Sequence, residues 1–233
     1  DSFVGDDPAD CHLALFTDAG FAGDLNDSHS TSGSYLVLIG PNTFAPLSWH
    51  CKKQGAVSHS TTEAEIIALD AAIRCEGIPM LMLLDCIKHV FGRQRRETVA
   101  ATMPHVHPID YVPTNAIELP RRTKLFVMED NEAVIAITIN GRAPNLRYLN
   151  RTHRVDMDWI LERIKDDDGI KIRCCKTKEM IADIFTKGTF TKPAWDALLE
   201  LAQIIPLPDA IDKKQPEDAV LKAVSYTHLT LPT

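Results

Sequence analysis

Hydrophobic and polar positions divide the chain into short apolar runs and segments in which apolar residues recur at helical spacing. The runs HLALF (12–16), GSYLVLIG (33–40) and PLSWHCK (46–52) predict three buried strands. The links between them are short, which favours an antiparallel meander. Two later runs, KLFVM (124–128) and GIKIRCC (169–175), predict a fourth and a fifth strand.

Between and after these strands the pattern changes to a helical period. Ser60-Thr61-Thr62-Glu63 is a capping-box signature, and it predicts a helix that stops at Gly77. Further helices are predicted at Pro79–Phe91, from Asn131 to about Ile139, at Arg151–Ile164, from Lys178 to Thr186 and at Lys192–Ile205. A meander followed by strand–helix units predicts an α/β domain with a mixed sheet covered by helices.

The segments differ enough in composition to suggest domain limits. Residues 1–10 are interpreted as a linker from an upstream part of a longer polypeptide, and 11–205 as one domain. Residues 92–123 contain four prolines and are interpreted as an insertion loop. Residues 206–233 form a Pro-rich, charged tail, and the last nine, 225–233, resemble a translated sequencing-adapter remnant.

Composition narrows the class of protein. With 45% hydrophobic and 24% charged residues among 233, the chain is neither disordered nor a coiled coil. Its longest apolar stretch, Ile78–Leu84, is far shorter than the roughly 18 residues of a membrane span, so no membrane association is expected. Its six cysteines form no CxxC pair, which favours reduced thiols and an intracellular, cytoplasmic location.

Charge is unevenly distributed. The net charge of −7 argues against a general nucleic-acid coat protein, yet residues 133–155 contain no acid and several arginines, among them Arg147 and Arg151. Two interpretations stay open for this stretch: a solvated helix face, or a strip that binds phosphates.

Two acids follow predicted strands: Asp18 after the first and Asp130 after the fourth. If these strands are parallel neighbours, both side chains lie at the same edge of the sheet, where sites form in α/β proteins. The alternative is that both acids cap turns or helices, a role that Asp fills well.

Two further acids lie on predicted helices. Glu65 shares a helix face with Ala68, Leu69 and Ala72, and an ionised carboxylate on such a face needs a cation or a donor. Glu63 instead has a capping role available. Asp183 is expected two turns into the helix after the fifth strand. Such carboxylates, if they converge, repel one another unless Mg²⁺ or Mn²⁺ neutralises them, and two such ions serve phosphodiester cleavage.

Six segments also carry a family resemblance, in this order: FTDAGFAGD, STSGSYLVLIG, PLSWHCKKQGAVSHSTTEAEIIALDAA, EDNEAVIAI, RTHRVDMDWI and MIADIFTKGTFTK. Together they resemble the ribonuclease H domain of copia-type LTR retrotransposon Pol polyproteins, over about Cys11 to Leu201. The segments SWxxKKQ…STxEAE and ADIFTK are specific in combination, whereas either alone is weak.

The resemblance implies a ribonuclease-H-like fold: a five-stranded mixed sheet with three antiparallel strands, then two parallel to the first. It implies an endoribonuclease that uses two Mg²⁺ (or Mn²⁺) ions to cut the RNA strand of RNA–DNA hybrids. The hybrid and an upstream reverse transcriptase are the implied partners, and the virus-like particle of a retroelement is the implied location. The implied catalytic and metal-binding residues are Asp18, Glu65, Asp130 and Asp183; the expected nucleic-acid contacts are Lys52, Lys53, Asn131, Arg147 and Arg151.

The chain also departs from the family pattern. Gly20 and Phe21 replace an Asp and a Trp, Ser34 replaces a Tyr, and Arg154 replaces a His. The loop 174–181 before the last acid has no His, although cellular ribonucleases H carry one there. An alternative function is therefore a catalytically inactive module that binds the hybrid or braces the reverse transcriptase.

Overall fold

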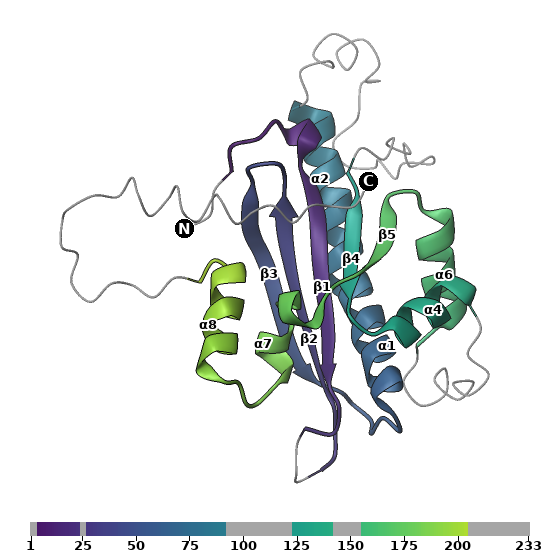
Figure 1. The fold of residues 1–233 in the computed structure, drawn as a ribbon. Helices are drawn as coiled ribbons and strands as arrows, with labels where there is room; N and C mark the ends of the chain where they lie inside the picture. Colours follow the sequence, from purple (N-terminus) through teal and green to yellow (C-terminus); the bar gives the residue numbers. More distant parts are fainter. Residues whose placement is uncertain (1–3, 24–26, 92–122, 142–154, 205–233) are drawn as a thin grey trace, which may run out of the picture.

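The computed structural model of the protein describes residues 4–23, 27–91, 123–141 and 155–204. Five strands form one sheet in the order β3-β2-β1-β4-β5 (Figure 1). The strands are β1 His12–Gly20, β2 Thr31–Ile39, β3 Phe44–Lys53, β4 Leu125–Glu129 and β5 Ile170–Cys174. The helices are α1 Thr61–Ala72, α2 Ile78–Phe91, α4 Glu132–Asn140, α6 Met157–Asp166, α7 Asp183–Thr186 and α8 Lys192–Leu201.

The sheet is mixed. β2 is antiparallel to both β1 and β3, whereas β4 is parallel to β1 and β5 is parallel to β4. The predicted meander and the two later parallel strands are thereby confirmed. This order and these directions are those of the ribonuclease-H-like fold, which the sequence predicted.

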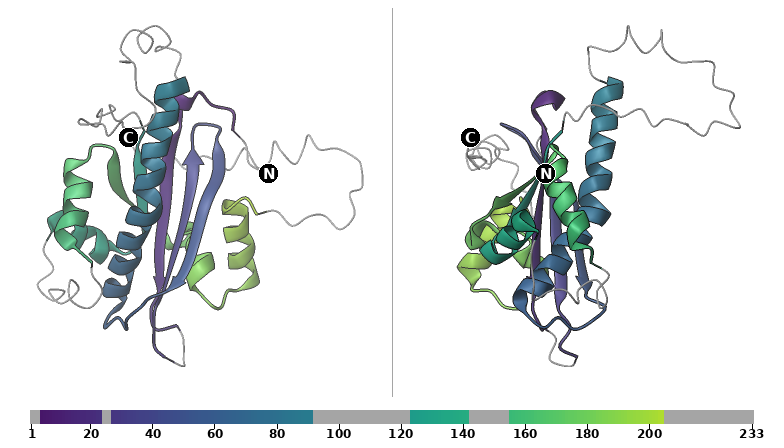
Figure 2. Two further views of the ribbon diagram at one scale, coloured as in Figure 1. Left: turned by 180° about the vertical axis from the view of Figure 1, so that it is seen from behind. Right: turned by 90° about the vertical axis from the view of Figure 1, so that its right-hand side faces the viewer.

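Side-chain alternation along β1 divides the core into two layers. Leu13 and Leu15 join a cluster with residues of α1 and α2, and Val134 of α4 and Ile160 of α6 belong to the same cluster. Ala14 and Phe16 point to the opposite face, where residues beside α7 and α8 cover the sheet. Figure 2 shows α1 and α2 running along one face as a long rod, with α7 and α8 behind the sheet.

The prediction that the first helix stops at Gly77 is wrong. A π-helical segment, Ile73–Gly77, joins α1 directly to α2, so that the helical path is continuous. A Cβ at Gly77 would lie 2.8 Å from Leu125 Cδ2 and 3.1 Å from Leu15 Cδ2. The glycine therefore permits a close approach of helix to sheet rather than ending the helix.

Three other helix limits differ from the prediction. Helix α6 begins at Met157 rather than Arg151, because the Asp156 side chain accepts hydrogen bonds from the N–H groups of Asp158 and Trp159 and caps it. Helix α8 ends at Leu201 and not at Ile205. Only the short helix α7 forms in the segment predicted as helix from Lys178 to Thr186, preceded by a 3₁₀ turn at Thr177–Glu179.

Several predictions fall on residues outside the described ranges. These include nearly all of the insertion loop 92–123, the tail 206–233 and the start of the predicted helix at 151–154. Within the predicted linker 1–10, Asp6 accepts hydrogen bonds from the backbone and side-chain nitrogens of Asn42, which ties this segment to the β2–β3 turn. No helix in the described part of the chain combines the length and apolar character that crossing a membrane requires. The six cysteines are free thiols.

Candidate catalytic carboxylate cluster

Asp18 and Asp130 lie at the same end of neighbouring parallel strands. Phe16 of β1 pairs with Met128 of β4; Asp18 follows two residues after Phe16 within β1, and Asp130 follows two residues after Met128, directly after the end of β4. Burial raises the pKa of Asp18 and the charge of Asp130 adds to this rise, while Thr186 and Lys187 oppose it. Neither acid is a cap: Asp18 lies within β1, and the N-cap of α4 is Asn131. The capping alternative is thus wrong for both.

Glu65 reaches this edge of the sheet from α1. It is buried, as its place on the apolar face predicted, and its Oε2 atom has no hydrogen-bond partner in the described structure. Burial, together with the charges of Asp18, Glu129 and Asp130, raises the pKa of Glu65 to about 10. A carboxylate held this way strongly favours a bound proton or a cation.

Glu63, two residues earlier, has the structural role that was predicted. Its backbone N–H donates to Ser60 Oγ at 3.1 Å, which caps α1. Its carboxylate accepts from the backbone N–H of His59 at 2.8 Å rather than from Ser60 itself. Glu63 therefore stabilises the N-terminus of α1, and only Glu65 belongs to the carboxylate cluster.

Asp183 is the first residue of α7, rather than two turns into a helix as predicted. Its position still brings it to the cluster, because α7 packs against β1 and β2. Burial and the charge of Asp18 raise the pKa of Asp183 to about 6, against the opposing effect of Lys187. Its Oδ1 atom is buried without a hydrogen-bond partner in the described structure.

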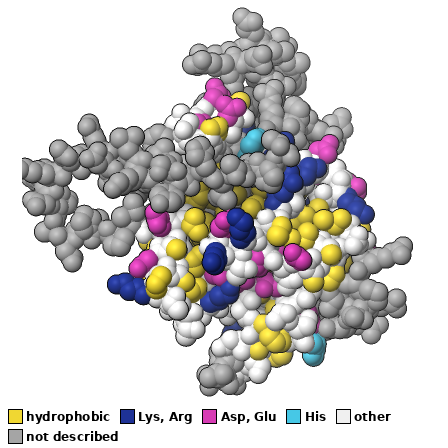
Figure 3. All heavy atoms as spheres, in the orientation of Figure 1, with side chains coloured by type: hydrophobic (Ala, Val, Ile, Leu, Met, Phe, Trp, Pro, Cys, Tyr) yellow, Lys and Arg dark blue, Asp and Glu magenta, His cyan; other side chains and the backbone are white. Residues whose placement is uncertain are grey.

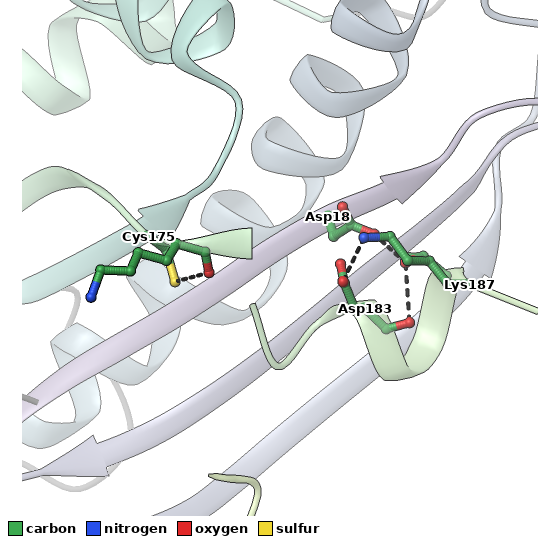
Figure 4. A network of polar contacts seen from close by, with 6 residues as sticks. Asp18, Cys175, Asp183 and Lys187 are labelled. Carbon is green, nitrogen blue, oxygen red and sulfur yellow. Dashed lines mark hydrogen bonds and ion pairs between the residues drawn. The ribbon is translucent and has the colours of Figure 1, made fainter. Parts of the chain in front are cut away.

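Two neighbours of Asp183 that the sequence prediction missed complete the cluster. The Lys187 ammonium lies 2.5 Å from Asp183 Oδ2, and Figure 4 shows it between Asp183 and Asp18. The Thr186 hydroxyl donates to Asp18 Oδ2. Burial lowers the pKa of Lys187, but the hydrogen bond and charge of Asp183 outweigh burial and raise it. The i,i+4 spacing of Asp183 and Lys187 was the available signal.

Glu129 is a further acid that the sequence prediction missed. It is fully buried at the end of β4, where it accepts hydrogen bonds from the Thr17 hydroxyl at 3.0 Å and the Asn131 N–H at 3.2 Å. Burial raises its pKa to about 8, although these two hydrogen bonds oppose the shift. Its signal was the strand alternation, which places Glu129 on the face of Leu125 and Val127, toward α1.

The structure therefore brings Asp18 and Asp130 into electrostatic contact with each of the other two predicted acids, Glu65 and Asp183. Within the described ranges, no three His, Cys, Asp or Glu side chains are placed so that they could hold a metal ion. The donor set nevertheless fits a hard divalent cation, because all four groups are carboxylates and buried oxygens of Glu65 and Asp183 have no partner. In the structure, the Lys187 ammonium supplies positive charge to this cluster.

Three of the five predicted nucleic-acid contacts, Lys52, Lys53 and Asn131, lie within the described residues. Lys52 and Lys53 are exposed at the end of β3, and Lys53 pairs with Asp27 at 2.6 Å. The Asn131 side chain caps α4 by accepting from the N–H groups of Ala133 and Val134. Arg147 and Arg151 lie outside the described residues.

Replacing Lys187 should destabilise the metal-free protein but increase the stabilisation that Mg²⁺ provides. Lys187→Gln should lower the melting temperature in EDTA by about 2–4 °C, since a partly exposed ion pair contributes about 1 kcal/mol. Millimolar Mg²⁺ should then raise the melting temperature of the variant more than that of the wild type, because ligand binding stabilises by mass action. Thermal melting measures both effects.

Lys171→Gln is the matched control, because Lys171 lies near the start of β5, at the opposite end of the parallel strands from the cluster, is 40% exposed and pairs with Asp168. It should change neither melting temperature nor Mg²⁺ response. Equal Mg²⁺ responses of wild type and Lys187→Gln would contradict the account.

Comparison with known sequences places the chain among retroelement proteins. No protein-family model matches the sequence. A Pol polyprotein of the Nicotiana tabacum transposon TNT 1-94 is 28% identical over 187 residues, or 79% of this chain. Those of the Arabidopsis thaliana transposons RE2 and RE1 are each 47% identical over 53 residues, 23% of this chain. The chain is a homologue of copia-type Pol polyproteins.

The Pol homologues are much longer than this chain. The matched part spans 11% of the tobacco polyprotein and 3% of each Arabidopsis polyprotein. Two solved ribonuclease H structures are also similar. One is LC11-RNase H1, isolated from compost, at 12% identity and TM-score 0.40 over 75% of this chain and 92% of that one. The other is the N-terminal ribonuclease H domain of Mycobacterium tuberculosis rv2228c, fused to maltose-binding protein, at 13% identity and TM-score 0.38 over 82% and 96%.

Proposed function

We propose that this Pol homologue is a metal-dependent endoribonuclease that hydrolyses the RNA strand of RNA–DNA hybrids during reverse transcription. The observation that carries the proposal is the gathering of Asp18, Glu65, Asp130 and Asp183 at one edge of a ribonuclease-H-like sheet. Buried carboxylates with raised pKa values are costly to a fold and are typical of functional sites.

The four carboxylates are the groups that would hold Mg²⁺ or Mn²⁺, most simply two ions. Bound there, the metal would activate a water nucleophile and neutralise charge on the phosphodiester. The protein's own contribution is to fix the carboxylates in place. The Thr186 hydroxyl orients Asp18, and the strand pairing of β1 with β4 sets Asp130 beside it.

An inactive module that only binds hybrid is the second candidate. It is favoured by the absence of a finished metal-site arrangement among the described residues and by the ion pair of Lys187 with Asp183. In that case the lysine would neutralise the cluster permanently. The proposal instead requires that divalent metal compete with the ammonium for the Asp183 carboxylate.

The proposed partners follow from the same function. They are an RNA–DNA hybrid and the reverse transcriptase expected upstream in a Pol polyprotein, inside a cytoplasmic virus-like particle. The exposed Lys52 and the predicted Arg147 and Arg151 would supply phosphate contacts, because an acidic protein needs a local basic surface to hold a polyanion.

Salt dependence of binding tests these contacts. Lys52→Ala, Arg147→Ala and Arg151→Ala should each weaken hybrid binding irrespective of sequence and reduce the salt slope by about one. Affinity would be measured by fluorescence anisotropy with Ca²⁺ in place of Mg²⁺, to prevent cleavage. Lys165→Ala, on α6, serves as the control. Unchanged salt slopes for all three variants would show that Lys52, Arg147 and Arg151 do not contact phosphates of the hybrid.

A cleavage assay tests the function itself. The purified chain is incubated with a hybrid labelled on the RNA strand, in Mg²⁺, in Mn²⁺ and in EDTA. The proposal predicts shortened RNA in either metal, none in EDTA, and no cutting of the DNA strand. Intact RNA in both metals, together with measurable hybrid binding, would favour the inactive module.

A further inference from the structure

An open pocket adjoins the carboxylate cluster on the side of α7 and α8. Its volume is about 460 Å³, and six residues line it: Ile184, Lys187, Gly188, Phe190, Lys192 and Trp195. Pockets that bind small organic groups have volumes of about 300–1,000 Å³, so this space is adequate for one nucleotide unit. Lys52, Lys53 and Asn131, the predicted nucleic-acid contacts that the structure describes, do not line it.

The lining combines aromatic rings with positive charge. The rings of Phe190 and Trp195 are both partly exposed, with centroids 5.3 Å apart and planes at 46°. The two charged residues in the lining are both lysines, in a chain whose net charge is −7. Aromatic faces that stack bases, together with cations that track phosphates, are the usual means by which proteins hold single nucleic-acid strands.

The pocket is continuous with the candidate catalytic site through one residue. Lys187 lines the pocket, and the same ammonium pairs with Asp183 in the cluster. Figure 3 shows Lys and Arg side chains over α7 beside Asp and Glu side chains and hydrophobic ones. A strand whose scissile phosphate lies at the carboxylates would therefore pass next to this pocket.

We infer that the pocket binds one nucleotide of a substrate strand beyond the cleavage position. The base stacks on Trp195, and Lys192 contacts the adjoining phosphate. The inference rests on the proposed function, since it takes the carboxylate cluster as the place where the strand is cut. It adds a binding site formed by α8, and it predicts a preference for hybrids that carry a single-stranded extension.

Binding of hybrids with and without extensions tests this site. Affinity is measured in Ca²⁺ for a blunt hybrid and for hybrids with a five-nucleotide RNA or DNA overhang. Trp195→Leu should weaken binding of at least one overhang hybrid by about five- to 50-fold, since loss of one stacked base has an effect of this size. Lys192→Gln should weaken it less and reduce the salt slope by about one.

Controls separate stacking from folding and from catalysis. Trp195→Phe keeps an aromatic face and should bind the overhang hybrids almost as tightly as the wild type does. Thermal melting shows whether Trp195→Leu is folded. Lys165→Gln, on α6, should have no effect. If well-folded Trp195→Leu and Lys192→Gln both bind the overhang hybrids as tightly as the wild type does, or if Trp195→Phe binds as weakly as Trp195→Leu, the inference is wrong. Wild-type cleavage of blunt hybrid would still support the proposed function in that case, so the two failures are distinguishable.

Discussion

Replacing Asp18 by Asn is expected to lower the rate of hybrid cleavage by about 10²–10⁴-fold, equivalent to about 3–5 kcal/mol of transition-state stabilisation. Asp18 has a central position in the cluster, because its charge acts on both Glu65 and Asp183, as that of Asp130 also does. Asn preserves its volume and can still accept the Thr186 hydroxyl. The loss would therefore come from the missing charge and metal ligand, and the fold should be retained. Single-turnover cleavage with saturating Mg²⁺ measures it.

The matched control for Asp18→Asn is Glu63→Gln. Glu63 is as deeply buried as the cluster, yet its carboxylate serves the N-terminus of α1, where Gln can accept the same hydrogen bond from His59. Its cleavage rate should stay within about threefold of wild type. Near-normal cleavage by Asp18→Asn would show that Asp18 is not a catalytic residue.

Glu65→Gln is expected to stabilise the metal-free protein at alkaline pH. The pKa of Glu65 is about 10 in the folded chain, against an ordinary value of 4.5, so the folded state binds the proton more tightly than the unfolded state does. Stability must therefore fall as the pH rises from about 4.5 toward about 10. Gln has no proton to lose, and its melting temperature should exceed that of wild type by about 2–8 °C at pH 8.

At pH 5 the two proteins should differ far less, because pH 5 is close to the ordinary pKa of 4.5 and keeping Glu65 protonated in the folded wild type then costs little free energy. The comparison is made in EDTA by calorimetry, with Glu200→Gln as a surface control on α8 that should follow wild type throughout. A wild-type advantage that grows with pH would show that Glu65 is held as a stabilised anion instead. Some pH dependence should persist in Glu65→Gln, since burial raises the pKa of Glu129 to about 8.

The sheet was predictable because each strand carries its own local signal. The apolar runs predicted the five strands, and the short links between the first three predicted the meander. The structure differs from these predictions only in where each strand begins and ends. Helix limits were less predictable because tertiary contacts decide them. Gly77 looks like a helix stop in sequence, but it lies where α1 and α2 cross Leu15 and Leu125, a contact that only the folded chain reveals.

The candidate site was predictable to the extent that strand ends and helix faces place its residues. The register of β1 and β4 brings Asp18 to Asp130, and the helical period places Glu65 on a buried face. Lys187 and Thr186 were missed because their role depends on how α7 lies across β1. Glu129 was missed because the family motif includes only its neighbours Asp130 and Asn131. Only the alternation along β4 indicates that the side chain of Glu129 points toward α1.

We propose that the four carboxylates form one divalent-metal site, which Mn²⁺ titration by isothermal calorimetry would reveal. Saturable Mn²⁺ binding is expected for the wild-type chain and for Glu63→Gln. Binding should be at least about tenfold weaker in Asp18→Asn and in Asp183→Asn, since each lacks one charged ligand. Titration curves for these two variants that coincide with the wild-type curve would contradict it.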